Sequence, residues 1–243
     1  QKDIENDGQG APLTPIFHNQ IVKNLNFNFN LDYPIKIINI GGITNVSLIT
    51  DNGNIEKSMF AYDIAPGNCL IDQWLKKNSN KKYDQDGKIA NQGTVNDLIF
   101  NQAVENFEII SIDESLDTKN FDFSFVKGLS LEDGCATLTK FTAYLIAEGL
   151  KKINLKSKNI PKNYIVCGGG RKNKTLIKEI NKFMKKEKNI LQNIDQYKID
   201  GDFIESQAFA YLAIRSNLKL PISFPNTTRC KKPISGGTIT NNF

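Results

Sequence analysis

Three apolar segments joined by two short turn sequences constrain the fold of this chain more than any other feature. Apolar residues dominate segments 35–40 and 45–49, and a Gly-Gly pair lies between them. A weaker third segment at 56–61 follows an Asp-Asn-Gly-Asn turn at 51–54. Because Asn and Gly tolerate the positive φ of tight hairpins, the sequence predicts three consecutive antiparallel strands.

Helical periodicity dominates the rest of the chain. Apolar residues at helical spacing predict helices at 68–77, 95–107, 133–153, 174–186 and 204–217. A short strand is predicted at 164–167, and loops are predicted at 78–93 and 111–129. This pattern indicates an α/β fold with a mixed sheet, in the order expected of a ribonuclease-H-like lobe, the unit that is duplicated in actin-like ATPases. A fold by itself does not assign a function.

Composition excludes several classes of protein. The formal charge of +5 is mild, and the lysine-rich stretch at 182–188 has no interleaved aromatic residues. That stretch therefore indicates a solvated helix face rather than a nucleic-acid site. No apolar run is long enough to span a membrane, and residues 1–10 are polar and acidic, unlike a signal peptide.

Cysteine and histidine usage restricts the chemistry further. The four cysteines form no Cys-x-x-Cys pair, which disfavours a zinc or redox site and fits a reducing, cytoplasmic setting. His18 is the single histidine, and no Gly-x-Ser-x-Gly motif is present. Any acid or base catalysis is therefore expected from carboxylates.

The glycine pair between the first two predicted strands is a candidate phosphate site. Gly41 and Gly42 would let backbone N–H groups approach an anion, and Thr44 and Asn45 would add side-chain donors. An ordinary hairpin turn is the alternative.

A second glycine-rich turn follows the strand predicted at 164–167. Gly168, Gly169 and Gly170 precede a helix that Asn173 would cap. Bare backbone at a helix N-terminus favours a phosphate or a flat ring, although the sequence is neither a P-loop nor a Rossmann fingerprint. A plain strand-to-helix connection is the alternative.

Three carboxylates are candidates for catalytic or binding roles. Asp63 precedes Gly67 and Asn68, at the predicted end of the three-strand unit, where it could hold a metal through water, contact the substrate or simply cap a helix. Asp3 lies beside a glycine loop at 8–12, where it could draw a proton from a hydroxyl or water, or be a solvated surface residue. Glu205 begins a helix and could contact a ligand or complement the helix macrodipole.

In order along the chain, these elements resemble the anhydro-N-acetylmuramic acid kinase family of the actin/hexokinase-like superfold. The matching strings lie at 3–18, 38–46, 63–68, 83–90, 136–143, 167–173, 205–210 and 220–228. Two departures affect the expected substrate contacts: Asp7 stands where the family has Gly, and 64–65 (Ile-Ala) where it has Thr-Gly. The family's first phosphate loop, Gly-Thr-Ser-x-Asp-Gly, has no counterpart in the sequence. We therefore expect an N-terminal part to lie outside it and this polypeptide alone to be inactive.

The resemblance implies a reaction and a set of roles. Water activated by Asp3 would open the bridge of 1,6-anhydro-N-acetylmuramic acid, and O6 would take the γ-phosphoryl of ATP, with Mg²⁺ on the phosphates. The product would be N-acetylmuramic acid 6-phosphate, an intermediate of cell-wall recycling. Gln9, Gly10 and Glu205 would contact the sugar. ATP would contact the two glycine turns, Thr44, Asn45, Asp63, Gly67 and Asn68.

The resemblance also implies an organisation. Residues 1–34 would end an N-terminal lobe and carry the catalytic loop, 35–217 would form the ATP-binding lobe, and 218–243 would be an irregular tail. A homodimer is expected from the family alone. Two other functions stay open: a non-catalytic actin-like nucleotide-binding module, and another sugar kinase of the superfold.

Overall fold

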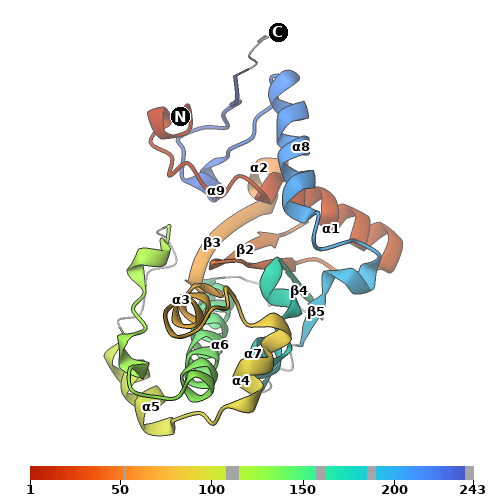
Figure 1. Cartoon of the computed structure of the whole chain (residues 1–243). Helices are drawn as coiled ribbons and strands as arrows, with labels where there is room; N and C mark the ends of the chain where they lie inside the picture. The colour runs from red at the N-terminus through yellow and green to blue at the C-terminus, as the bar shows by residue number, and fades with distance from the viewer. Residues whose placement is uncertain (52, 108–114, 157–162, 185–189, 239–243) are drawn as a thin grey trace.

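The computed structural model describes residues 1–51, 53–107, 115–156, 163–184 and 190–238, and its centre is a five-stranded mixed sheet (Figure 1). The strands are β1 (Ile35–Ile40), β2 (Ile43–Ile49), β3 (Met59–Pro66), β4 (Asn163–Cys167) and β5 (Leu191–Asn193), in the spatial order β3-β2-β1-β4-β5. β2 pairs antiparallel with β1 and β3, whereas β4 runs parallel to β1 and β5. The predicted α/β class with a mixed sheet is confirmed.

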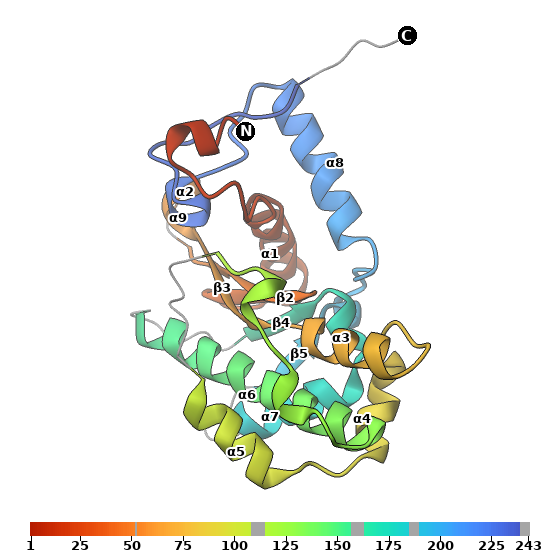
Figure 2. The ribbon, with the colours of Figure 1, turned by 60° about the vertical axis from the view of Figure 1, so that its left-hand side comes forward.

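Helices cover both faces of the sheet (Figures 1 and 2). One hydrophobic cluster joins the sheet to α1 (Pro15–Phe29), α2 (Ile55–Ser58), α8 (Ile204–Asn217) and Phe224, the residue before α9 (Pro225–Thr228). The other joins it to α3 (Cys69–Asn78), α4 (Lys88–Gln92), α5 (Asp97–Asn106), α6 (Leu131–Lys156) and α7 (Lys174–Met184). Short 3₁₀ turns are η1 (Ile4–Asn6), η2 (Gln85–Gly87), η3 (Thr118–Asn120), η4 (Ser124–Val126), η5 (Gly169–Lys172) and η7 (Ile194–Tyr197). Among the described residues, no helix has both the length and the apolar character needed to cross a membrane.

Burial on both faces explains why β1 is a nearly continuous apolar run. Ile35 and Ile37 belong to the cluster with α1, whereas Ile38 and Ile40 belong to the cluster with α6. Each of the four side chains is fully buried. A strand covered by helices on both sides has no solvent face that would favour polar residues at alternate positions.

The third strand begins later than predicted. Residues 55–58 form the short helix α2, because the Asn54 side chain accepts a hydrogen bond from the backbone N–H of Glu56 at 2.8 Å and caps the turn. β3 then runs from Met59 to Pro66. As a consequence Asp63 lies inside a strand, not at the junction with the following helix.

Two helical segments lie outside the helices predicted from the sequence. Residues 15–29 form α1, whose Pro15 starts the helix and whose Ile21, Val22 and Leu25 are buried. Many Asn residues between these apolar positions obscure the helical period in the sequence. The predicted loop at 78–93 contains η2 and α4, because the Asp84 carboxylate accepts hydrogen bonds from two N–H groups at the start of α4. Part of the predicted loop at 111–129 (111–114) and the end of the predicted helix at 174–186 (185–186) lie outside the described residues.

The two ends of the described chain lie side by side, as both views show (Figures 1 and 2). The backbone N–H of Gln9 donates to the carbonyl of Thr228 at 2.7 Å, and that of Lys231 donates to the carbonyl of Asn6 at 3.2 Å. Residues more than 200 positions apart therefore form one local structure above the sheet.

Stability should depend on pH through His18. Its side chain is buried between α1 and β2, where Nδ1 lies 2.8 Å from Ser47 Oγ, and burial lowers the pKa of His18 from 6.5 to about 4. Below pH 6.5 His18 is protonated in the unfolded chain but stays neutral in the folded chain. The free energy of unfolding therefore falls as the pH drops toward 4. At pH 4.5 we expect the free energy of unfolding to lose roughly 2–3 kcal/mol from this residue.

Urea unfolding at pH 7 and pH 4.5 measures this loss. His18→Gln cannot bind the proton, so the difference between the two pH values should shrink by roughly 2–3 kcal/mol in that variant. The same pH dependence in both proteins would rule out His18 as its source.

Candidate functional site

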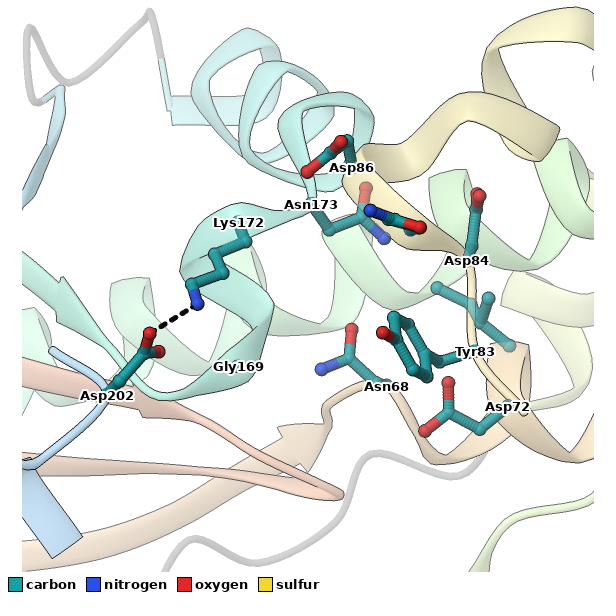
Figure 3. A pocket seen from close by; sticks show the side chains of 11 residues that line it. Asn68, Asp72, Tyr83, Asp84, Asp86, Gly169, Lys172, Asn173 and Asp202 are labelled. Atoms are coloured by element: carbon teal, nitrogen blue, oxygen red, sulfur yellow. Dashed lines mark hydrogen bonds and ion pairs between the residues drawn. The ribbon is translucent and has the colours of Figure 1, made fainter. Parts of the chain in front are cut away.

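A cavity of about 460 Å³ opens beside the turn that follows β4 (Figure 3). Its wall is formed by the start of α3, the η2–α4 segment, η5 and the loop before α8. Asn68, Tyr83, Gly169 and Lys172 line it, together with the carboxylates Asp72, Asp84, Asp86 and Asp202. A volume in this range is typical of small-molecule sites.

The three glycines of the turn after β4 have different physical roles. A Cβ on Gly168 would lie 2.7 Å from the Ile40 carbonyl oxygen, and a Cβ on Gly170 would lie 2.3 Å from Ile40 Cγ2. Gly168 also has φ +77°, which side chains rarely adopt. Gly169, in contrast, faces open space and lines the cavity. The outer glycines let the turn pack against β1, and the middle one presents bare backbone to the cavity.

The residues after the glycines hold the turn in place. The Asn173 side chain accepts a hydrogen bond from Leu176 N–H at 3.0 Å, so it caps α7 as predicted. The buried Arg171 guanidinium donates to the Gly168 carbonyl at 3.2 Å. It also pairs with Asp195 and Asp202, at 3.0 and 2.9 Å. The turn is thus joined to the loop that leads into α8.

The hairpin turn between β1 and β2 meets the same cavity through Asn68. Gly67 N–H donates to the Gly42 carbonyl and Asn68 N–H to the Gly41 carbonyl, both at 2.8 Å. A Cβ on Gly67 would lie 2.2 Å from the Gly41 oxygen, so only glycine fits there. Asn68 also lines the cavity, as does Gly169 of the turn after β4. Asn68 therefore connects the hairpin turn with the cavity wall that the second glycine turn forms.

The polar residues beyond the hairpin are partly engaged within the sheet. The Thr44 hydroxyl is buried and donates to the Pro66 carbonyl at 3.1 Å. Asn45 is half-buried and lies opposite Asp63, beside a register irregularity in the β2–β3 pair. Asp63 Oδ2 accepts the Leu116 N–H at 2.9 Å. Burial raises the pKa of Asp63 above its ordinary value, although that hydrogen bond and the charge of Arg229 act in the opposite direction.

Asp3 is a buried carboxylate with two strong hydrogen-bond donors. Its Oδ2 accepts the Gly10 N–H at 2.7 Å, and its Oδ1 accepts the Thr228 hydroxyl at 2.6 Å. A Cβ on Gly8 would lie 2.1 Å from Asp3 Oδ2, so this glycine is needed for the carboxylate to fit. Burial, the largest influence, acts to raise the pKa of Asp3, but hydrogen bonding to Thr228, Gly10, Ser223 and Cys230 together outweighs it and holds the pKa below its usual range.

A short bridge connects the Asp3 loop with the sheet. The Ser115 hydroxyl donates to Gln9 Oε1 at 2.8 Å, and the next residue, Leu116, donates to Asp63 as described above. The structure therefore brings Asp3, Gln9 and Gly10 to the side of the sheet on which Asp63 lies. Glu205 is exposed in the first turn of α8 and is not among the described residues that line the cavity.

Several residues of this region were not selected from the sequence. Tyr83 and Asp72 line the cavity, and Thr228 holds Asp3. Burial raises the pKa of Asp72 to about 6, Lys76 opposes this shift, and the charge of Asp84 adds to it. Tyr83, Asp84 and Thr228 lie within strings that match the family, but no local pattern ties Asp72 or Thr228 to a ligand. Only the folded chain places them.

The described residues contain no group of three His, Cys, Asp or Glu side chains that could hold a metal ion. The four cysteines are free and buried. Mg²⁺ needs no such group, because it is usually bound by one or two carboxylates together with water and the oxygen atoms of a bound phosphate.

Comparison with known proteins identifies related sequences. A family model described as "Anhydro-N-acetylmuramic acid kinase" matches residues 1–242. A protein of that name from Pelagibacter ubique is 50% identical over 246 residues, covering 100% of this chain and 64% of its own length. Another of that name, from Methylorubrum populi, is 38% identical over 98% of this chain and 59% of its own length.

Among solved structures, the activator of the 2-hydroxyisocaproyl-CoA dehydratase from Clostridium difficile with bound ADPNP has a TM-score of 0.45 and 14% identity, covering 80% of this chain and 65% of that chain. The chain spans about three fifths of the length of the curated relatives it matches.

Proposed function

The chain belongs to the anhydro-N-acetylmuramic acid kinase family, and from this premise we propose that it carries the general base and one nucleotide-binding wall of such a kinase. The observation that carries the proposal is the buried Asp3 carboxylate, which accepts hydrogen bonds from Gly10 and Thr228. The family model matches residues 1–242 of this chain, which include all three residues. The substrate would be 1,6-anhydro-N-acetylmuramic acid and the phosphoryl donor ATP.

The general base is Asp3. Its low pKa keeps it ionised at neutral pH, and an ionised carboxylate can accept a proton from water. Water would attack the anomeric carbon and give its proton to Asp3. The bond between that carbon and O6 breaks, O6 bonds to the γ-phosphorus, and ADP leaves. Gln9 and Gly10, which lie beside the base, would contact the sugar. Glu205 would be a further sugar contact.

ATP would lie along the cavity and the two glycine turns. Gly169, flanked by Gly168 and Gly170, leaves bare backbone at the cavity wall, which suits the flat adenosine moiety. Toward the phosphates, the proposed contacts are Gly41, Gly42, Thr44, Asn45, Gly67 and Asn68. The Thr44 hydroxyl and the Gly41 N–H both donate to backbone carbonyls, so the exposed Gly42 offers the better backbone donor to phosphate.

Mg²⁺ fits the same region through Asp63. Its Oδ2 is occupied by Leu116 N–H, which leaves Oδ1 for a metal-bound water, and Mg²⁺ prefers few protein carboxylates and several waters. When bound, the ion would neutralise charge that develops on the phosphates.

We further propose the organisation that the family suggests. Residues 1–34 and the tail at 218–243 would belong with an N-terminal lobe, and 35–217 would form the ATP-binding lobe. The contacts between Gln9 and Thr228 and between Asn6 and Lys231 support grouping the two ends. A cytoplasmic homodimer completes the proposal.

The test uses this chain and a fusion in which it replaces the matching 64% of the Pelagibacter ubique relative. ADP release is followed with and without the anhydro sugar, and the sugar product is identified by mass. We expect sugar-dependent ADP release and a phosphorylated, hydrated sugar from the fusion. A rate of ADP release that is the same with and without the sugar would contradict the proposal. It would favour a nucleotide-binding module without sugar kinase activity.

A further inference from the structure

One side chain from the far end of the chain holds the carboxylate of Asp3. Thr228 is fully buried, and its hydroxyl donates to Asp3 Oδ1 at 2.6 Å. The other oxygen of the carboxylate accepts the Gly10 N–H, so both oxygens are fixed by donors from different segments. Ser223 and Cys230, also buried, complete the surroundings of the carboxylate.

We propose that Thr228 is a positioning residue for the reaction, which fixes the orientation and the ionised state of Asp3; this inference rests on the proposed function. An ionised carboxylate only accepts hydrogen bonds, whereas a protonated one must also donate. The Thr228 hydroxyl has a single proton, and its other acceptor, the Phe224 carbonyl, is farther away at 3.5 Å. Donation to Asp3 therefore favours the charged form of that carboxylate.

The same residue also fixes the neighbouring loop. The Thr228 carbonyl accepts the backbone N–H of Gln9 at 2.7 Å, so Thr228 holds the base by its side chain and the adjacent loop by its backbone. The next residue, Arg229, donates to the Ala61 carbonyl in β3 at 3.0 Å and packs its guanidinium over the Tyr62 ring. Through Arg229, the position of Thr228 is set relative to the sheet.

The other titratable groups near Asp3 do not supply a positive charge that would stabilise its ionised carboxylate. Burial raises the pKa of the Cys230 thiol, which keeps it neutral at ordinary pH. Asp7 and Lys231 pair with each other and are largely exposed. The described groups with the largest effects on the pKa of Asp3 include no charged partner. Hydrogen-bond donors, the hydroxyl and N–H groups among them, therefore favour its ionised form.

The decisive variants are Thr228→Val, which removes the hydroxyl and keeps the shape, and Thr228→Ser, which keeps the hydroxyl. Thr228→Ala is a second removal in case Val perturbs folding. Thr227→Val is the matched control, because Thr227 is buried in the same short helix and its hydroxyl donates to Phe224 instead of Asp3.

The readout is the titration of the Asp3 side-chain carbon by NMR in the whole chain with labelled Asp, which needs no turnover. In the unmodified chain and in Thr228→Ser, the pKa of Asp3 should lie below the ordinary value for an aspartate. In Thr228→Val or Ala its pKa should rise by about one to two units, as expected for the loss of one hydrogen bond to a charged group. The acid limb of the kcat/KM profile of the fusion should move in the same direction.

An unchanged Asp3 titration in Thr228→Val and Ala, or an equal shift in Thr227→Val, would overturn the assignment. The proposed function is tested separately, by the turnover of Asp3→Asn in the fusion protein. Full turnover in that variant would contradict the proposed function. The NMR result does not depend on that outcome.

Discussion

Replacing Asp3 by Asn in the fusion protein is expected to lower turnover of the anhydro sugar by about 10²–10⁴-fold, the usual contribution of a general base. ATP affinity should change little, because Asp3 is not among the described residues that line the cavity in which we propose that ATP binds. An amide cannot take the proton from water, and its NH₂ group would face the Thr228 hydroxyl or the Gly10 N–H. Steady-state kinetics with a nucleotide-binding titration separate the two effects.

Glu5→Gln is the matched control for this variant. Glu5 lies two residues away and is exposed in η1, so its loss should leave turnover nearly unchanged. Thermal unfolding of both variants shows whether lost turnover reflects lost structure. Turnover of Asp3→Asn within a factor of two of the parent would remove Asp3 from the mechanism.

The second large effect is expected at the turn after β4. Gly169→Leu should weaken nucleotide binding roughly tenfold to hundredfold, because its side chain would occupy the cavity that Gly169 lines. That range corresponds to about 1–3 kcal/mol, the usual cost of forcing extra methylene groups into a filled site. Its free energy of unfolding should stay within about 0.5 kcal/mol of the parent, since a Cβ there meets open space.

Gly170→Ala provides the contrast at the neighbouring position. Its Cβ would lie 2.3 Å from Ile40 Cγ2, so we expect stability to fall by about 1–3 kcal/mol. Calorimetric nucleotide titration and urea unfolding of both variants test the pair. Normal nucleotide affinity in Gly169→Leu would place the nucleotide elsewhere.

Local patterns were enough to predict the elements that form the sheet's centre. β1 is a nearly continuous buried run and has the predicted bounds, as does the helix α8, because tight turns and helical periods are encoded by neighbouring residues. The third strand was misplaced because the Asn54 cap competes with strand formation over residues 55–58. The three-residue strand β5 offers too short a pattern to stand out.

The candidate site was predictable only in part, for a physical reason. Asp3, Gln9 and Gly10 are close in sequence, so the glycine loop together with the family resemblance indicated all three. Thr228 is 225 positions from Asp3, and their hydrogen bond exists only because the tail returns to the N-terminal segment. Similarly, the cavity carboxylate Asp72 looks like an ordinary helix residue until α3 is packed beside η2. Contacts of this kind are set by tertiary structure.

The most direct test of the central claim is the fate of solvent oxygen. The fusion protein is run with ATP and the anhydro sugar in ¹⁸O-labelled water, and the product is reduced at once and analysed by mass spectrometry. If water opens the bridge and O6 then takes the phosphoryl group, one ¹⁸O should appear at the anomeric carbon and none in the phosphate ester. Label that appears only in free phosphate, with the sugar left intact, would contradict the account.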